Sequence, residues 1–185
     1  QNQRLSQKKM IASRKGGEVK HQQKIERIRI IREKAKQEVD KISKRELWLM
    51  GTMLYWAEGS KEKEWGCGQN IQFSNSDAAM IKFFLRWLTD IFQIEKSRVV
   101  FGIYIHENHR GIIDKVRGYW SRQTGFPVSC FDYVYYKKHN PKTRRKNAGN
   151  HYYGLLRITV RSSSDLNRKI SGWIDGTSEY YCRVV

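Results

Sequence analysis

Cysteine is scarce in this sequence: Cys67, Cys130 and Cys182 are the only three among 185 residues. No two of them form a C-x-x-C pair, and no histidine lies beside them at the spacing of a zinc ligand. This pattern argues against a structural zinc site and indicates a reduced protein that is cytoplasmic (at the nucleoid) or organellar. The N-terminal stretch is polar and basic without an apolar core, so we expect no signal peptide and no secretion.

Long apolar runs are absent as well. The most apolar stretch, residues 47–57, is far shorter than the roughly 20 residues that a membrane-spanning helix requires. No lipid-anchoring motif accompanies it. We therefore expect no membrane partner, and we expect no small-molecule substrate either.

Acidic residues are few: 18 Asp and Glu stand against 36 Lys and Arg, which leaves a formal net charge of +18. An excess of this size favours a polyanionic partner, and nucleic acid before a membrane surface. Residues 1–45 alone contain 15 basic and 5 acidic residues, a net charge of +10. The positive charge is therefore concentrated near the N-terminus.

Residues 1–42 differ in kind from residues 43–185, and we expect them to form a separate basic helical arm or linker. After Gly16 and Gly17, the segment 19–39 has helical composition, with a narrow apolar stripe that includes Ile28 and Ile31. One interpretation is an arm that contacts DNA and packs along the domain or a partner. The other is a solvated linker helix that leads from an upstream domain.

The segment 47–60, LWLMGTMLYWAEGS, is the most distinctive part of the second region. Ser43 and Glu46 have the S-x-x-E spacing of a helix capping box, and Gly59 is a natural helix terminator. Between them nearly every residue is large or apolar. A helix that is apolar all round is expected to be buried all round, here between two protein layers.

Glu58 is unusual because it ends this apolar helix. A carboxylate at a helix C-terminus is unfavourable by about 0.3–1 kcal/mol. Gly51 lies two turns before Glu58 on the same helix face, so two such helices crossing there would bring two carboxylates together. A divalent cation such as magnesium or calcium would relieve their repulsion. The alternative is an ordinary core helix whose terminal Glu58 reaches solvent.

Beyond Gly59 the sequence predicts a hairpin that ends with the strand 70–74, a helix capped by Asn75 or Ser76, and a strand over 98–106. A helix over 111–123, strands over 131–138 and 155–161, and a helix over 164–175 follow. A basic loop, residues 137–150, separates the last two strands and carries six Lys or Arg. This order predicts an α+β fold with a mixed or antiparallel sheet backed by helices.

The alternating strands place polar side chains on one face of that sheet. In 155–161, Arg157, Thr159 and Arg161 alternate with apolar residues, and arginines two apart can reach phosphates or guanine edges. The alternative is an ordinary solvated sheet face. The candidate DNA-binding residues of the strands and the basic loop are Asn70, Gln72, Ser74, Tyr104, His106, Lys137, Lys138, Lys142, Arg144, Arg145, Lys146, Arg157, Thr159 and Arg161.

The segment GTMLYWAEG, Gly51 to Gly59, resembles the helix motif of the LAGLIDADG homing endonuclease family, and the similarity extends over roughly residues 43–176. Glu58 stands at the acidic position of that motif; Met53 departs from it, because a glycine is usual there. The resemblance implies a curved sheet saddle on DNA, backed by helices. It also implies Mg²⁺-dependent hydrolysis of two phosphodiester bonds, with Ca²⁺ or Mn²⁺ as substitutes.

The resemblance further implies roles for individual residues. Glu58, Lys61 and Asp77 are the implied catalytic residues, and Glu58 and Gly59 the implied metal ligands. A single motif implies a homodimer, whose implied interface residues are Gly51, Leu54, Tyr55 and Ala57.

Three functions are compatible with these patterns. The first is a homing endonuclease of a mobile element, acting on double-stranded DNA as a homodimer. The second is a sequence-specific DNA-binding regulator on the same scaffold without catalysis. The third is an RNA-binding protein, because the tyrosine-rich stretch 131–136 offers rings for stacking on unpaired bases.

Overall fold

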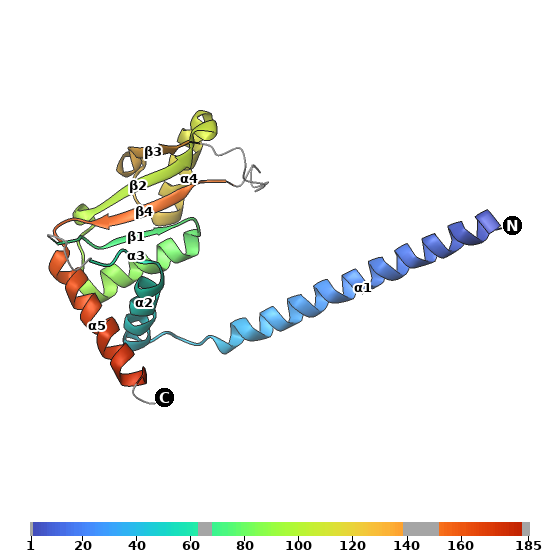
Figure 1. Cartoon of the computed structure of the whole chain (residues 1–185), viewed down its shortest axis with the longest axis horizontal. Coiled ribbons are helices and arrows are strands. Elements are labelled where there is room, and N and C mark those ends of the chain that lie inside the picture. The colour runs from blue at the N-terminus through green and yellow to red at the C-terminus, as the bar shows by residue number, and fades with distance from the viewer. Residues whose placement is uncertain (1, 63–67, 139–151, 183–185) are drawn as a thin grey trace. The chain divides into compact units, whose positions relative to one another are not determined.

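The computed structural model describes residues 2–62, 68–138 and 152–182 (Figure 1). The chain divides into two compact units, Gln1–Ile42 and Ser43–Val185, and each is described by itself. In the described ranges, no helix is both long enough and apolar enough to cross a membrane.

The first unit is one helix, α1, Asn2–Glu38. The helix does not begin after Gly16 and Gly17 as predicted, because α1 continues through both glycines, and no atom of the rest of the structure lies within 4 Å of a Cβ built on either. A glycine inside a helix costs only about 1 kcal/mol relative to alanine, which a long helix tolerates. Ile28 and Ile31 of the predicted stripe are exposed on α1.

The second unit is an α+β domain built on a four-stranded mixed sheet, as the strand pattern predicts. The strands are β1 Gln72–Asn75, β2 Val99–His106, β3 Tyr133–Lys137 and β4 Leu155–Val160. Their spatial order is β1-β4-β2-β3, where β1/β4 and β4/β2 are antiparallel and β2/β3 are parallel (Figure 1). The parallel pair requires a long crossover connection, which contains a helix.

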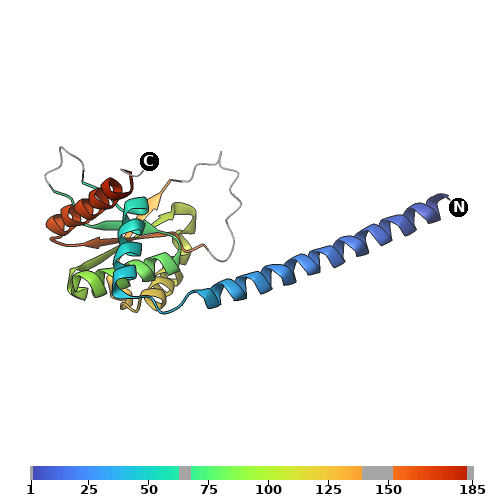
Figure 2. The ribbon, with the colours of Figure 1, turned by 90° about the horizontal axis from the view of Figure 1, so that it is seen from below.

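The helices of the domain are α2 Lys44–Glu58, α3 Ala78–Phe92, α4 Ile113–Thr124 and α5 Ser164–Cys182. Three short 3-10 helices join them to the strands: η1 Lys96–Arg98, η2 Glu107–Ile112 and η3 Val128–Phe131. Helices α2 and α3 lie in front of the strands when the domain is seen from below (Figure 2).

The core lies between these helices and one face of the sheet. Leu156, Ile158 and Val160 of β4 are fully buried, whereas Arg157 and Thr159 between them are only half-buried. This alternation confirms the predicted period of two. The core residues of the helices stack on the strand residues: the Phe84 ring of α3, for example, lies 4.4 Å from that of Phe73.

Helix α2 begins at the capping box that the sequence predicts. The backbone N–H of Glu46 donates to Ser43 Oγ at 3.2 Å, and the N–H of Ser43 donates to the Glu46 carboxylate at 2.6 Å. The hydrogen bonds from Ser43 hold the pKa of Glu46 below its usual value of 4.5. Helix α3 is capped by Asp77 rather than by Asn75 or Ser76, because the Asp77 carboxylate accepts from the N–H of Ala79 at 2.7 Å.

Removing the α2 cap has a defined expected cost. The substitution Ser43→Ala should lower the free energy of unfolding by about 1 kcal/mol at neutral pH, because it leaves a helix N–H without its acceptor. Ser76→Ala is the matched control, since Ser76 does not cap α3, and it should change the stability by much less.

The cap also predicts a dependence on pH. Since the folded-state pKa of Glu46 is lowered, its contribution is present above about pH 4.5 and is lost as the pH falls through the lower folded-state value. Urea unfolding at pH 7 and pH 3 checks both points. An equal effect of Glu46→Gln at the two pH values would contradict the role given to Glu46.

Candidate functional site

Helix α2 has one buried face and one exposed apolar face. Gly51, Thr52 and Tyr55 are buried, whereas Leu49, Met50 and Trp56 are 39–45% exposed. The single chain therefore covers only one of the two sides of this helix that the sequence predicts to be buried. We call the second surface the α2 apolar face; its residues are Leu49, Met50, Met53, Trp56 and Ala57. Their spacing over two helical turns puts them on one side of α2.

Gly51 lies on the buried face of α2, and its lack of a side chain lets α2 approach α3 closely. A Cβ placed on Gly51 would lie 2.1 Å from the Trp87 ring, and the Trp87 indole N–H donates to the carbonyl of Trp48 at 3.3 Å. Two of the predicted interface residues, Gly51 and Tyr55, are thus buried within their own chain, and Leu54 packs against the core. Of these four residues, only Ala57 is exposed. The close approach that glycine permits is used by α3, not by a partner chain.

Tyr55 fixes the position where α2 ends. Its hydroxyl oxygen lies 2.7 Å from the Ser60 carbonyl and 3.1 Å from Asn167 Oδ1, and it accepts from the N–H of Gln72 at 3.4 Å. Burial raises the pKa of Tyr55 to about 12, so the hydroxyl stays protonated at neutral pH. The tyrosine therefore ties the chain after α2 to β1 and α5.

Glu58, the last residue of α2, is exposed beside the sheet edge. Its neighbour Gly59 forms an antiparallel bridge with Phe73, and the N–H of Ser60 donates to the carbonyl of Gln72 at 3.0 Å. These contacts form the described part of the predicted hairpin; residues 63–67 lie outside the described residues. Glu58 thus reaches solvent where α2 meets β1, as the alternative interpretation of this helix expects.

A single chain supplies few ligands for a metal at Glu58. Over residues 2–62, 68–138 and 152–182, no three His, Cys, Asp or Glu side chains are grouped so that they could hold a metal ion. Oxygen ligands suit Mg²⁺, but one exposed carboxylate is not a site by itself. The residues present therefore fit the predicted cation only if a second chain brings its own Glu58.

The other two predicted catalytic residues differ in their surroundings. Lys61 is exposed, three residues after Glu58. Asp77 uses its carboxylate to cap α3, which is a structural role that the sequence pattern did not assign to it. Sequence reasoning also did not single out Glu62, whose carboxylate receives two hydrogen bonds from the Arg168 guanidinium at 3.0 and 3.1 Å.

The face of the sheet opposite the core gathers half of the predicted DNA-binding residues. We call it the open sheet face; it carries Gln72, Ser74, Tyr104, His106, Lys137, Arg157 and Thr159. Lys138 and Arg161 are exposed just beyond the strand ends. Asn70 is used differently from the prediction, because its side-chain oxygen accepts from the N–H of Ser163 at 2.8 Å. Lys142, Arg144, Arg145 and Lys146 lie outside the described residues.

Arg157 is engaged within this face. Its Nε donates to Ser74 Oγ at 3.1 Å, and one terminal nitrogen donates to the Tyr104 hydroxyl at 2.6 Å. The predicted free reach of Arg157 toward phosphate is therefore restricted, because two of its five N–H donors are already used. Its guanidinium instead sets the orientation of Tyr104.

Two exposed tyrosines of β3 were not among the predicted site residues. Tyr133 and Tyr135 are 55% and 50% exposed, and the Tyr135 ring stacks on Tyr104 at a centroid distance of 4.6 Å. Their signal in the sequence was the alternation of tyrosine in this strand. Next to them the open sheet face is hollowed by about 190 Å³; Gln72, Val100, Phe101, Gly102, Tyr104, Tyr133, Tyr135, Arg157 and Thr159 line this hollow.

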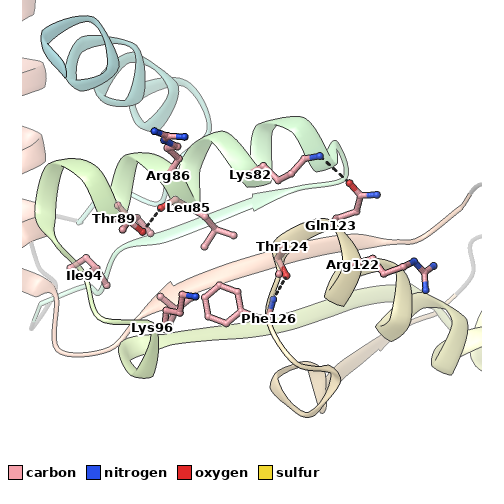
Figure 3. A pocket seen from close by; sticks show the side chains of 13 residues that line it. Lys82, Leu85, Arg86, Thr89, Ile94, Lys96, Arg122, Gln123, Thr124 and Phe126 are labelled. Atoms are coloured by element: carbon pink, nitrogen blue, oxygen red, sulfur yellow. Dashed lines mark hydrogen bonds between the residues drawn. The ribbon is translucent and has the colours of Figure 1, made fainter. Parts of the chain in front are cut away.

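A larger cavity of about 440 Å³ lies on the helical side of the sheet, between α3 and α4 (Figure 3). Lys82 Nζ donates to Gln123 Oε1 at 3.1 Å across this gap, and Lys96 Nζ lies 5.8 Å from the centre of the Phe126 ring. Arg86 at the rim is paired with Asp90 at 2.9 Å. This cavity belongs to the packing of the helices and shares no lining residue with the hollow of the open sheet face.

The chain matches no protein-family model, and comparisons with curated proteins and with solved structures found no match. The function is therefore argued from the sequence and the geometry of the chain.

Proposed function

We propose that the chain is a site-specific double-stranded DNA endonuclease of the LAGLIDADG homing type, which acts as a homodimer. The observation that carries this proposal is the α2 apolar face, which runs along the helix to Ala57, the residue before the exposed Glu58 at the helix end. A contiguous apolar surface on a soluble domain marks an interaction site. A second copy is the partner that also completes the incomplete carboxylate site.

The α2 apolar face suits a two-fold contact. In a two-fold dimer the same residues of both chains meet, so Met50, Met53 and Trp56 of one helix would pack against their counterparts. Ala57 is small and precedes Glu58, so it allows the two helix ends to approach. A two-fold axis that passes near the two Ala57 residues would bring together the two helix ends, and with them the exposed Glu58 residues.

The residues around Glu58 support hydrolysis of phosphodiester bonds. Glu58 of each chain, with the carbonyl oxygen of Gly59, would hold the divalent cation. When bound, Mg²⁺ supplies charge stabilisation at the phosphate and a more acidic water molecule. Lys61, exposed three residues after Glu58, would neutralise charge on the phosphate.

The open sheet face supports binding of the DNA. Gln72 and Thr159 lie opposite each other in register and present an amide and a hydroxyl, which hydrogen-bond base edges in the major groove. Each chain has a net charge of +18, so a dimer carries +36. The logarithm of affinity should fall with the logarithm of salt concentration, with a slope of about −0.9 for each phosphate neutralised. A two-fold protein favours a roughly palindromic site.

The substitution Glu58→Gln tests the proposal. It should reduce Mg²⁺-dependent cleavage by at least about 100-fold, because the amide cannot ligate a cation or accept a proton as the carboxylate does, while binding is kept. Sites are first selected by binding of the wild type to a plasmid library with randomised inserts in EDTA, which prevents metal-dependent cleavage. Cleavage of the selected plasmids is then followed in Mg²⁺.

Glu95→Gln is the matched control, because Glu95 is an exposed carboxylate before η1 and lies outside the site. It should cleave like the wild type. If Glu58→Gln also cleaves like the wild type, Glu58 is not the catalytic acid. Specific binding by the wild type without cleavage in any divalent cation would favour the non-catalytic regulator instead.

A further inference from the structure

The open sheet face contains a gap in a row of aromatic rings. Strands β2 and β3 pair in parallel, so that Tyr104 lies opposite Tyr135 and Gly102 lies opposite Tyr133. The first pair stacks, with ring centroids 4.6 Å apart and planes 15° apart. In the second pair glycine supplies no ring. Tyr133 is 55% exposed and makes no ring stack with another residue of the described ranges.

The hollow of about 190 Å³ lies at this gap, and its walls are chemically distinct. Tyr104, Tyr133 and Tyr135 form an aromatic side, and Gln72, Arg157 and Thr159 form a polar side. A Cβ on Gly102 would lie 3.2 Å from Tyr135 Cε2 and 3.6 Å from Tyr104 Cε2. The absence of a side chain at Gly102 therefore allows the stacked rings of Tyr104 and Tyr135 to lie close to the backbone of β2, where they form one wall of the hollow.

One group on the polar side of the hollow, Arg157, is held in place before any ligand binds. Arg157 is fixed by its hydrogen bonds to Ser74 and Tyr104, so its remaining N–H groups have a set direction. Gln72 offers both a donor and an acceptor, and Thr159 offers a hydroxyl. These groups together can hydrogen-bond the edge of a planar heterocycle whose face lies on a tyrosine.

The size of the hollow restricts the ligand. Pockets for drug-sized molecules and cofactors have volumes of about 300–1,000 Å³, so this hollow accommodates a single ring system rather than a cofactor. Nucleobases are ring systems of this size that stack on tyrosine and are recognised along a polar edge. A base inside a duplex has both faces covered by its neighbours, and it can stack on tyrosine only after it leaves the stack.

We propose that the hollow over Gly102 binds one unpaired nucleobase, turned out of a DNA duplex that lies on the open sheet face. The base stacks beside Tyr133 and Tyr135, and Gln72, Arg157 and Thr159 contact its edge. The inference rests on the proposed function only in that DNA is the ligand; it does not require that the protein cleaves DNA.

The test uses the full chain and two DNA hairpins with one 2-aminopurine each. They differ only in the thymine opposite that base, which is present in the paired hairpin and omitted in the hairpin with the single-base bulge. Binding is measured in EDTA by fluorescence anisotropy of an end label and by the 2-aminopurine emission. The bulged hairpin should bind about 10-fold more tightly than the paired one. The emission of its 2-aminopurine should fall on binding, because the base stacks on a ring.

The variants separate stacking from folding. The double variant Y133A/Y135A should lose this preference of about 10-fold for the bulged hairpin, which lies within the roughly 5- to 100-fold that one stacked base usually contributes. The double variant Y133F/Y135F, which keeps both rings, should retain it. G102V, whose side chain occupies the floor of the hollow, should also lose the preference.

Three results would overturn the inference: equal affinity for the bulged and paired hairpins, equal behaviour of the alanine and phenylalanine variants, and tighter binding of single-stranded RNA of the same sequence than of the bulged DNA. The last result would favour the RNA-binding alternative. Because EDTA prevents metal-dependent cleavage, failure of the endonuclease proposal leaves this measurement unchanged. The two proposals can therefore fail separately.

Discussion

Replacing Met50 and Trp56 together by glutamate is expected to convert the protein from a dimer into a monomer and to abolish DNA cleavage. Both side chains are about 40% exposed on the α2 apolar face, so the folded monomer can place a glutamate there in water. In a dimer the same positions would be covered by the partner helix. The substitution therefore penalises the dimer and not the monomer.

The size of the effect follows from the two-fold symmetry. Two substitutions place four carboxylates in the interface, and each loses at least about 1 kcal/mol of solvation without a compensating partner. A total of about 4 kcal/mol corresponds to a roughly 1,000-fold weaker dimer. Sedimentation of the full chain over a range of concentrations measures this shift, and cleavage of a selected plasmid measures its consequence.

A matched control separates the interface from net charge. Ile112→Glu with Val128→Glu also replaces two exposed apolar side chains by glutamate and lowers the charge equally, but neither residue lies on α2. This variant should remain dimeric and should cleave DNA. The proposed interface is wrong if the control dissociates as well, or if the wild type is a monomer at the concentrations where it cleaves.

Sequence reasoning succeeded where a signal is local. The capping box of Ser43 and Glu46 is present as predicted, since its geometry involves only residues three apart. The strand over 155–161 appears as Leu155–Val160 with the predicted alternation, because a sheet with one covered face requires a period of two. The predicted order of helices and strands after Gly59 is also confirmed, because each element is indicated by the spacing of apolar residues within its own segment.

The same reasoning failed where the outcome depends on a distant residue. The all-round apolar character of residues 47–57 does not say which face turns inward, and Trp87 of α3 decides it by occupying the space next to Gly51. Likewise, the alternation of β4 places Arg157 on the open sheet face, but Ser74 and Tyr104 on other strands determine what its guanidinium does. Contacts between distant segments have no signature in the spacing of either segment.

The substitution Gly51→Ala tests whether local helix propensity or the distant contact with Trp87 decides the stability at this position. Helix propensity alone predicts that alanine inside α2 raises the free energy of unfolding by about 0.5–1 kcal/mol. The packing predicts the opposite, because the added methyl carbon would lie 2.1 Å from the fully buried Trp87 ring, and inserting a group into a packed core costs about 1–3 kcal/mol. We expect the packing term to be larger, with a net loss of about 1–2 kcal/mol in urea unfolding.

Gly172→Ala in α5 is the control, because no atom lies within 4 Å of a Cβ at that position outside the helix itself. It should gain stability by the propensity term alone. Adding Trp87→Phe to Gly51→Ala should recover part of the loss, so the double variant should be more stable than the sum of the two single effects. If Gly51→Ala stabilises the protein as Gly172→Ala does, Trp87 does not restrict Gly51. If it leaves unfolding unchanged and weakens only the dimer, Gly51 belongs to the interface that its spacing from Glu58 predicted.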